Sequence, residues 1–518
     1  MAGYIGGKAV NLSTSGADIS GTANLDAVNI DGAVQIDATL SVGVNDTGYD
    51  VKFFGATASR HMTWDESADS LIISGDLDVN DGTIKLDGNY PVATHNVALG
   101  DAAGSALTTG IKNTFLGSLA GDAITTGNNI VAVGYQALSN DQQGSGSVAI
   151  GNQALTTQRF TSATAVYNVA VGQQAGEAVT TGIQNTLIGG LAGDALTTGG
   201  TNVAVGYESL STEDTGRQSV AVGYQALAVQ NKDDTNLNTA VGYQAGLAIT
   251  TGVSNDIFGG SAGDALTTGS FNVALGRSSL SADTQGSTSV AVGHAALAAQ
   301  NFTSATNSFN TAVGYAAGND ITTGVENTLI GGNAGDALTD ADFNVVVGGY
   351  ALSTDTLGSG SVAIGAAALN KQNFTSATNT GNVAVGFTAG KEVTTGTNNV
   401  LIGSEAGDAI TDGNTNVAVG SRSLTTNQRG DKNTSIGHKS LENMNPSGDV
   451  DTYNTALGFQ AGNDVTTGVQ NTFVGSLAGD GTDDGAQNTA VGYLALSANA
   501  ADTNTAIGAF ALTDCTGG

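Results

Sequence analysis

The stretch Asn202-Val203-Ala204-Val205-Gly206 decides the fold, because it returns along most of the chain. We count 24 copies between Asn96 and Gly508, and each ends in Gly. Successive copies recur with a period of about 17 residues, as from Gly189 to Gly206, and every fourth step is longer. Four steps therefore make a second period of about 72 residues. A fixed short period indicates a solenoid of stacked coils.

The phrase alternates in a way that predicts one short strand per coil, and hence an all-β parallel solenoid of about 24 coils. The residue before each closing Gly is Val, Leu or Ile, except Phe258, and two places earlier stands Val or Thr, except Asp256. These two positions share one face of the strand. We expect them to form the packed interior of each coil.

The residue between those two lies on the opposite strand face, where a solvated surface would be polar. It is Ala in 16 copies and bulky and apolar in six, each in the second coil of a 72-residue unit: Phe115, Leu187, Ile257, Leu329, Leu401 and Phe473. A strand that is apolar on both faces is buried on both. The pattern therefore predicts a homotrimer, with these six side chains packed at its axis.

The first residue of the phrase is Asn in 19 copies. Stacked Asn side chains can bond to each other and to turn backbone at every coil. We interpret the column as a structural ladder and not as a set of catalytic amides.

The sequence divides into three regions. Residues 1–45 have short alternating segments and too little apolar mass for a core of their own, so we expect them to fold in an oligomer or against a docking partner. Residues 46–90 form a small β-domain with strands predicted at 49–54, 61–64 and 71–73. Residues 91–518 form the solenoid shaft.

Composition excludes several function classes. The chain of 518 residues has 15 basic and 46 acidic side chains, a net charge of −31, which argues against nucleic acid and anionic membranes as partners. No apolar stretch is long enough for a spanning helix, and we expect neither membrane insertion nor a signal peptide. The single Cys515 excludes an internal disulfide framework.

The best candidate for ligand contact is the longer loop of the fourth coil, which carries Phe160, Phe302 and Phe374 beside Thr, Ser and Asn residues. Such an aromatic could stack on a sugar of a host receptor. The alternative, which we favour, is that the ring covers the edge of the stack.

The remaining motifs are weaker indications of a functional site. The segment 76–82 resembles a calcium loop but lacks Gly at the sixth place, so outward carboxylates of a strand are preferred there. The recurring Gly-Asp-Ala phrases, such as Gly121-Asp122-Ala123, are interpreted as solvated turns. No nucleophile–His–carboxylate grouping, phosphate loop or zinc spacing is present. We expect no catalytic residues, no metal, no cofactor and no enzyme activity.

Two segments of the sequence resemble known protein families. Gly48-Tyr49-Asp50-Val51-Lys52-Phe53-Phe54-Gly55, with Met62-Thr63-Trp64-Asp65-Glu66-Ser67, resembles a module of bacteriophage tail and fibre proteins. Ser147-Val148-Ala149-Ile150-Gly151 is similar to the head repeat of trimeric autotransporter adhesins, which form a left-handed parallel β-roll in a trimer. The coils here are longer, and the basic neck, coiled-coil stalk and membrane anchor of that family are not found.

Together the resemblances imply a virion structural protein, a homotrimeric phage tail fibre that projects a β-roll shaft for host attachment. Its N-terminal region would dock to a tail or baseplate protein, and its loops would meet a host surface glycan or protein. The alternative is a bacterial surface adhesin segment of the trimeric autotransporter head type. A glycan-degrading spike is disfavoured, since no paired carboxylates stand apart from the repeat.

Overall fold

A computed structural model describes residues 51–54, 61–65, 70–74 and 95–514. The chain groups into two compact units, Met1–Lys85 and Leu86–Gly518, which are considered separately. The described residues form strands and turns, and none of them lies in a helix. The expected N-terminal region 1–45 and the expected boundary at residues 90 and 91 lie outside the described residues.

The described part of the first unit is a three-stranded antiparallel sheet. It consists of β1 (Val51–Phe54), β2 (His61–Asp65) and β3 (Ser70–Ser74), with β2 in the centre. Val51 pairs with Trp64, which in turn pairs with Leu71. The three strands predicted from the sequence are confirmed, with ends shifted by one or two residues.

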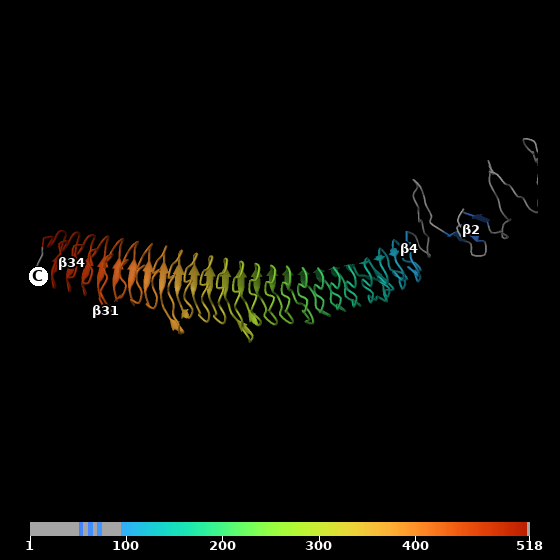
Figure 1. The fold of residues 1–518 in the computed structure, drawn as a ribbon, viewed down its shortest axis with the longest axis horizontal. Helices are drawn as coiled ribbons and strands as arrows, with labels where there is room; N and C mark the ends of the chain where they lie inside the picture. The colour runs from blue at the N-terminus through green and yellow to red at the C-terminus, as the bar shows by residue number, and fades with distance from the viewer. Residues whose placement is uncertain (1–50, 55–60, 66–69, 75–94, 515–518) are drawn as a thin grey trace, which may run out of the picture. The chain divides into compact units, whose positions relative to one another are not determined.

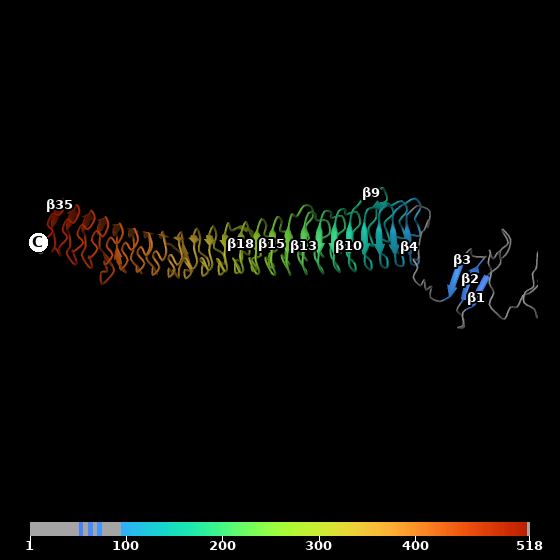
Figure 2. The same cartoon turned by 90° about the horizontal axis from the view of Figure 1, so that it is seen from above.

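The second unit is a parallel β-solenoid of 24 coils, each with one strand that pairs in register with the next (Figures 1 and 2). At about 4.8 Å per strand the stack is roughly 115 Å long. The strands are β4 (Val97–Leu99), β5 (Thr114–Leu116), β6 (Val131–Val133), β8 (Val148–Ile150), β10 (Val169–Val171), β11 (Thr186–Ile188), β12 (Val203–Val205), β13 (Val220–Val222), β14 (Thr239–Val241), β15 (Asp256–Phe258), β16 (Val273–Leu275), β18 (Val290–Val292), β20 (Thr311–Val313), β21 (Thr328–Ile330), β22 (Val345–Val347), β24 (Val362–Ile364), β26 (Val383–Val385), β27 (Val400–Ile402), β28 (Val417–Val419), β30 (Thr434–Ile436), β32 (Thr455–Leu457), β33 (Thr472–Val474), β34 (Thr489–Val491) and β35 (Thr505–Ile507).

Four pairs of two-residue strands accompany longer coils. The pairs are β7 (Gly144–Ser145) with β9 (Thr164–Ala165), β17 (Gly286–Ser287) with β19 (Thr306–Asn307), β23 (Gly358–Ser359) with β25 (Thr378–Asn379), and β29 (Gly430–Asp431) with β31 (Val450–Asp451). Each pair ties the longer loop to the coil before it, so the inserted residues do not interrupt the stack.

The Gly that closes each phrase is required by the stacking. Gly206 has φ +141°, and a Cβ there would lie 2.2 Å from the carbonyl oxygen of Gly223 in the next coil. No side chain can occupy that space, and an L-residue would also be strained at this φ. Because every coil turns in the same way, the same residue recurs in all 24 copies.

The predicted Asn ladder is confirmed. The Asn202 Nδ2 group donates to the carbonyl oxygen of Gly216 at 2.9 Å, within its own coil. Its Oδ1 accepts from the backbone N–H of Ser219, in the next coil, at 3.0 Å. Since the side chains are fully buried, each satisfies polar backbone groups that water cannot reach. The column holds successive coils at a fixed spacing and contributes no open site.

The coil interior lies on the strand face opposite to the one we expected. The middle residue of each strand points inward, and Ala204 is fully buried within the single chain, whereas Val203 and Val205 remain partly exposed. The six bulky middle residues assigned to a trimer axis are likewise 0% exposed inside their own coils: Phe115, Leu187, Ile257, Leu329, Leu401 and Phe473. That assignment is wrong.

Glycines explain why a bulky residue returns at this place. A Cβ at Gly104 would lie 2.7 Å from the Phe115 ring, and one at Gly121 would lie 2.4 Å from it. Leu187 is placed in the same way against Gly176 and Gly193. In the coils that have Ala as the middle residue, Leu often takes the place of that Gly, as Leu138 and Leu210 do, and is buried. Large and small residues therefore exchange places to fill a narrow interior.

Candidate functional site

The candidate functional surface is the outer stripe, which we define as the first and third residues of each of the 24 solenoid strands. The third residue is Val, Ile, Leu or Phe in every strand, and the first is Val in 13, Thr in 10 and Asp256 in one. Figures 1 and 2 show the strands following one another along one side of the stack, so these side chains form a continuous band.

This apolar band is partly to largely exposed in the single chain. Ile188, Ile330 and Ile402 are 38–40% exposed, although β-branched residues are usually buried. A parallel sheet is normally covered on both faces, and an exposed apolar area larger than a few hundred Å² marks an interaction site. The chain carries 61 Lys, Arg, Asp and Glu residues, yet Asp256 is the only one of them in the stripe. Its composition is that of an interface.

Aromatic side chains border the stripe on both sides. Just after the closing Gly stand Tyr207, Tyr224 and Tyr243, whose rings stack with centroids 5.8 and 5.4 Å apart. On the other border, just before the buried Asn, Tyr167 and Phe271 are each 60% exposed. Tyr and Phe are enriched at protein interfaces. In the tyrosine stack each ring covers its neighbour's face, so these rings present mainly their edges to a ligand.

The loop phenylalanines are not available for ligand contact. Phe160, Phe302 and Phe374 are only 5–8% exposed. The backbone N–H of Phe302 donates to Asp283 Oδ1 at 3.1 Å, which fixes the start of the loop. A buried ring cannot stack on a sugar, so the receptor-contact interpretation of these residues is wrong for this conformation. Their burial agrees with the alternative, in which the ring covers the stack.

Sequence reasoning missed a buried polar cluster beneath these loops. Asp283 is fully buried, and its Oδ2 accepts from Gln300 Nε2 at 2.6 Å while its Oδ1 accepts from Gly286 N–H at 2.9 Å. Gln300 also bonds to Ser289 Oγ and to Asn310 Nδ2. The same arrangement holds Asp141 with Gln158, Glu213 with Gln230, and Asp355 with Gln372.

A signal for this cluster was present in the sequence. Its carboxylates and glutamines occupy a column that holds Leu107 and Ile124 in other coils, so a polar residue there had to be buried. Burial raises the pKa of the Glu213 carboxyl. Every polar atom named above is engaged by a neighbour, so the cluster positions the long loop and offers no free group for chemistry.

The Gly-Asp-Ala turns are less solvated than predicted. One carboxylate oxygen is buried without a hydrogen-bond partner in Asp122, Asp194, Asp336 and Asp408, and also in Asp480 of the related turn Gly479-Asp480-Gly481. Burial raises the pKa of each of these carboxyls, and that of Asp264. For Asp408 the pKa rises to about 6, because nearby Glu405 adds to the effect of burial.

Asp408 should make stability depend on pH. Its folded pKa of about 6 lies above the ordinary 3.8, so the ionised form costs stability above pH 6 and the cost disappears as the pH falls toward 4. Since the group is about half exposed, we expect a cost of roughly 1 kcal/mol at pH 7. Asp408→Asn should raise the urea midpoint at pH 7 and change it little at pH 4. Ser404→Asn, on the surface of the same coil, is the control. An equal shift at both pH values would contradict the assignment.

Within residues 51–54, 61–65, 70–74 and 95–514, no three His, Cys, Asp or Glu side chains converge to hold a metal ion. In the same ranges there is no helix with the length and hydropathy of a membrane span. The calcium-like segment 76–82 lies outside the described residues. A scan of family models finds no match, and neither the search of curated proteins nor that of solved structures finds one.

Proposed function

We propose that this chain is a structural protein, the shaft of a homotrimeric fibre in which the outer stripes of three parallel copies meet along a common axis. The observation that carries the proposal is the stripe itself, apolar in its third-residue column in all 24 strands and partly or largely exposed in the single chain. Removing such a surface from water is the main source of association free energy. The proposal keeps the expected trimer and moves its interface to the other strand face.

The geometry of the stripe suits parallel association of identical chains. Strands pair in register from β4 to β35, so the stripe runs without a break along the stack and presents each copy with the same spacing. The aromatic borders then lie where neighbouring copies converge at the edges of the interface. Three copies, and not two, follow from the similarity of the repeat to trimeric adhesin heads. We also propose that the 72-residue spacing is the structural unit of the shaft.

The biological setting we propose is a bacteriophage tail. Support comes from the resemblance of residues 48–67 to fibre modules and from the long stack of uniform coils, which suits a spacer. The N-terminal region would dock to the tail or baseplate, and the shaft would carry the chain toward a glycan or protein of the host surface. A bacterial surface adhesin is the second candidate, favoured by phrases such as Ser361-Val362-Ala363-Ile364-Gly365.

Sedimentation tests the assembly. Three chains of 51.0 kDa give about 153 kDa, and we expect this mass to persist on dilution because a long apolar interface dissociates slowly. A stable monomer would contradict the proposed interface. A stable dimer would leave the interface standing and contradict only the number of chains. Antibodies against the shaft test the setting. Labelling of virion tails supports the phage fibre, and labelling of intact bacterial surfaces supports the adhesin instead.

A further inference from the structure

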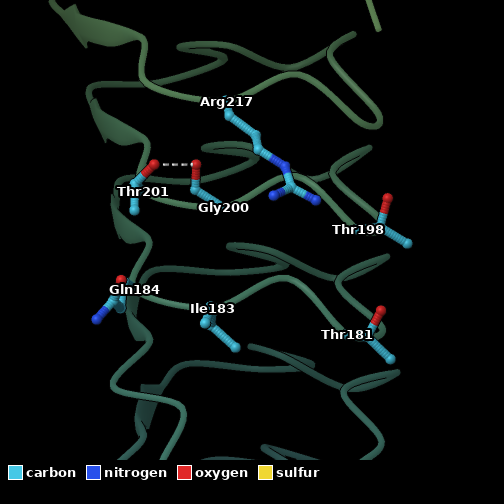
Figure 3. Close-up of a pocket in the computed structure, with 7 residues that line it drawn as sticks. All are labelled: Thr181, Ile183, Gln184, Thr198, Gly200, Thr201 and Arg217. Carbon is cyan, nitrogen blue, oxygen red and sulfur yellow. Dashed lines mark hydrogen bonds between the residues drawn. The ribbon is translucent and has the colours of Figure 1, made fainter. Parts of the chain in front are cut away.

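A pit on the solenoid surface, beside the border column of the outer stripe that contains Tyr167 and Phe271, has the features of a ligand site. It has a volume of about 300 Å³ and is lined by Thr181, Ile183, Gln184, Thr198, Gly200 and Arg217, with Thr201 at its edge (Figure 3). Ile183, Gly200 and Arg217 follow one another in the same column of three successive coils. Gly200 has no side chain, so the column is interrupted and a hollow opens between Ile183 and Arg217.

In most other 72-residue units this column caps its own backbone, although Ala486 supplies no oxygen for the N–H of Val469. The side-chain oxygen of one coil accepts the backbone N–H of the residue below it, as Asn128 Oδ1 does for Ile111 at 2.8 Å and Asp342 Oδ1 does for Val325 at 2.8 Å. Ser270 and Asn414 act in the same way. One coil further on, an oxygen again caps the column, from Ser145, Ser287, Ser359, Asp431 and Asp502.

At the pit both caps are missing. Gly200 supplies no oxygen for the N–H of Ile183, and Arg217, which has only donors, supplies none for the N–H of Gly200. Neither N–H has an acceptor in the part of the chain that the structure describes. A Cβ at Gly200 would lie 2.9 Å from the Ile183 carbonyl oxygen and 3.5 Å from the Ile183 nitrogen, so a side chain there would stand beside that donor after a small shift of the backbone.

The charge of Arg217 is also uncompensated at close range. Its side chain is exposed and forms no ion pair within 4.0 Å with any described residue. In the view of Figure 3 its guanidinium group lies between Gly200 and Thr198. Thr198 and Thr181 stand along one side, and Gln184 and Thr201 along the other. A planar cation with several donors is suited to a carboxylate.

We propose that this pit binds a sugar acid, a saccharide residue that carries a carboxylate beside hydroxyl or ether oxygens. The carboxylate takes the guanidinium of Arg217 and the N–H of Gly200, and a neighbouring sugar oxygen takes the N–H of Ile183. The two N–H groups are one coil apart, about 4.8 Å, farther than the two oxygens of one carboxylate, so the ligand needs a second oxygen-bearing group. The volume suits a single sugar residue, at the small end of ligand pockets.

Calorimetric titration of the full chain with D-glucuronate tests the site, with D-glucose and acetate as comparison ligands. We expect glucuronate to bind at least tenfold more tightly than either. Arg217→Ser introduces the residue that Ser145, Ser287 and Ser359 supply elsewhere, and should reduce glucuronate affinity at least tenfold. Gly200→Ser, which copies Ser270, should do the same by capping Ile183. Arg277→Ser removes another exposed arginine and should leave affinity within twofold.

Several outcomes would overturn the proposal. Absence of glucuronate binding to the full chain excludes the ligand class, and equal binding of acetate or glucose excludes a sugar acid as its occupant. Unchanged affinity in both serine variants, with native circular dichroism, places binding elsewhere. The site goes beyond the fibre role and does not depend on it, since the sedimentation result and the titration can fail separately.

Discussion

Three aspartates in the outer stripe, Val313→Asp, Val347→Asp and Val385→Asp, should reduce the sedimenting mass of the shaft from about 153 kDa toward that of one chain. The three valines are the third residues of β20, β22 and β26, in alternate coils, so the new charges do not meet within one chain. At the proposed axis they would be buried without partners. An unpaired charge costs several kcal/mol when it is removed from water.

The control must carry the same charge elsewhere. Thr109→Asp, Thr181→Asp and Thr251→Asp place three aspartates at exposed positions, and Figure 3 shows Thr181 on the side of the coil away from the strands. We expect this variant to keep the wild-type mass. Both variants should keep the circular dichroism of a β-solenoid, because none of the six side chains points into a coil. A stripe variant that stays fully assembled would show that the stripe is not the interface.

The repeat alone was sufficient to predict the architecture. Every coil has the same turn, so the Asn that begins the phrase could be assigned a structural role from its recurrence. The parallel strands and their stacking in chain order followed from the short, fixed period of the phrase. A periodic sequence is favourable for such inference, because each rule is tested many times in one chain.

The inside and outside of the strand could not be assigned from side-chain size. Larger β-branched residues were placed inside by analogy with ordinary cores, but a coil this short encloses a narrow interior that is filled mainly by alanine. The correct signal was a correlation between columns, in which a bulky residue such as Leu329 accompanies Gly318 and Gly335. When one residue is large wherever the other is small, the two side chains fill the same interior space.

The pit escaped sequence reasoning for a different reason. Gly200 and Arg217 are ordinary residues for a solenoid surface, and their meaning appears only when the hydrogen bonds of neighbouring coils show what they fail to supply. The side chains of Ser270 and Asp342 accept a backbone N–H of the neighbouring coil, and only this comparison shows that Gly200 lacks such an acceptor. The sequence does not show which hydrogen bonds the repeat makes, so the loss of one of them can be recognised only in the structure.

Leu329→Asp and Ile330→Asp, at adjacent residues of β21, should fail in different ways. Leu329 is fully buried in its coil and Ile330 is 40% exposed in the outer stripe. Aspartate at 329 leaves an unpaired charge inside the coil, and we expect local unfolding, seen as fast hydrogen exchange in residues 326–340. Aspartate at 330 should leave exchange slow in the isolated chain. Equal exchange in the two variants would contradict the assignment of the two faces.

A volume swap tests the interior more strictly. Leu329→Ala should cost about 2–5 kcal/mol, because it leaves a cavity beside Gly318 and Gly335. Gly335→Leu alone should also destabilise the coil, since a Cβ there would lie 2.9 Å from Leu329. Together the two changes reproduce the neighbouring pattern of Ala363 with Leu369, both buried. Leu369 adopts φ 48°, so leucine is tolerated at that turn.

The double variant should therefore be more stable than either single variant, by at least about 1 kcal/mol in a double-mutant cycle of urea midpoints. Additive losses would mean that the two columns do not share one space. The compensation follows from a narrow interior whose total volume is fixed by the coil, so a bulky residue in the middle column requires glycine in the facing column. The same constraint explains why a bulky middle residue appears only in coils where the facing column holds glycine.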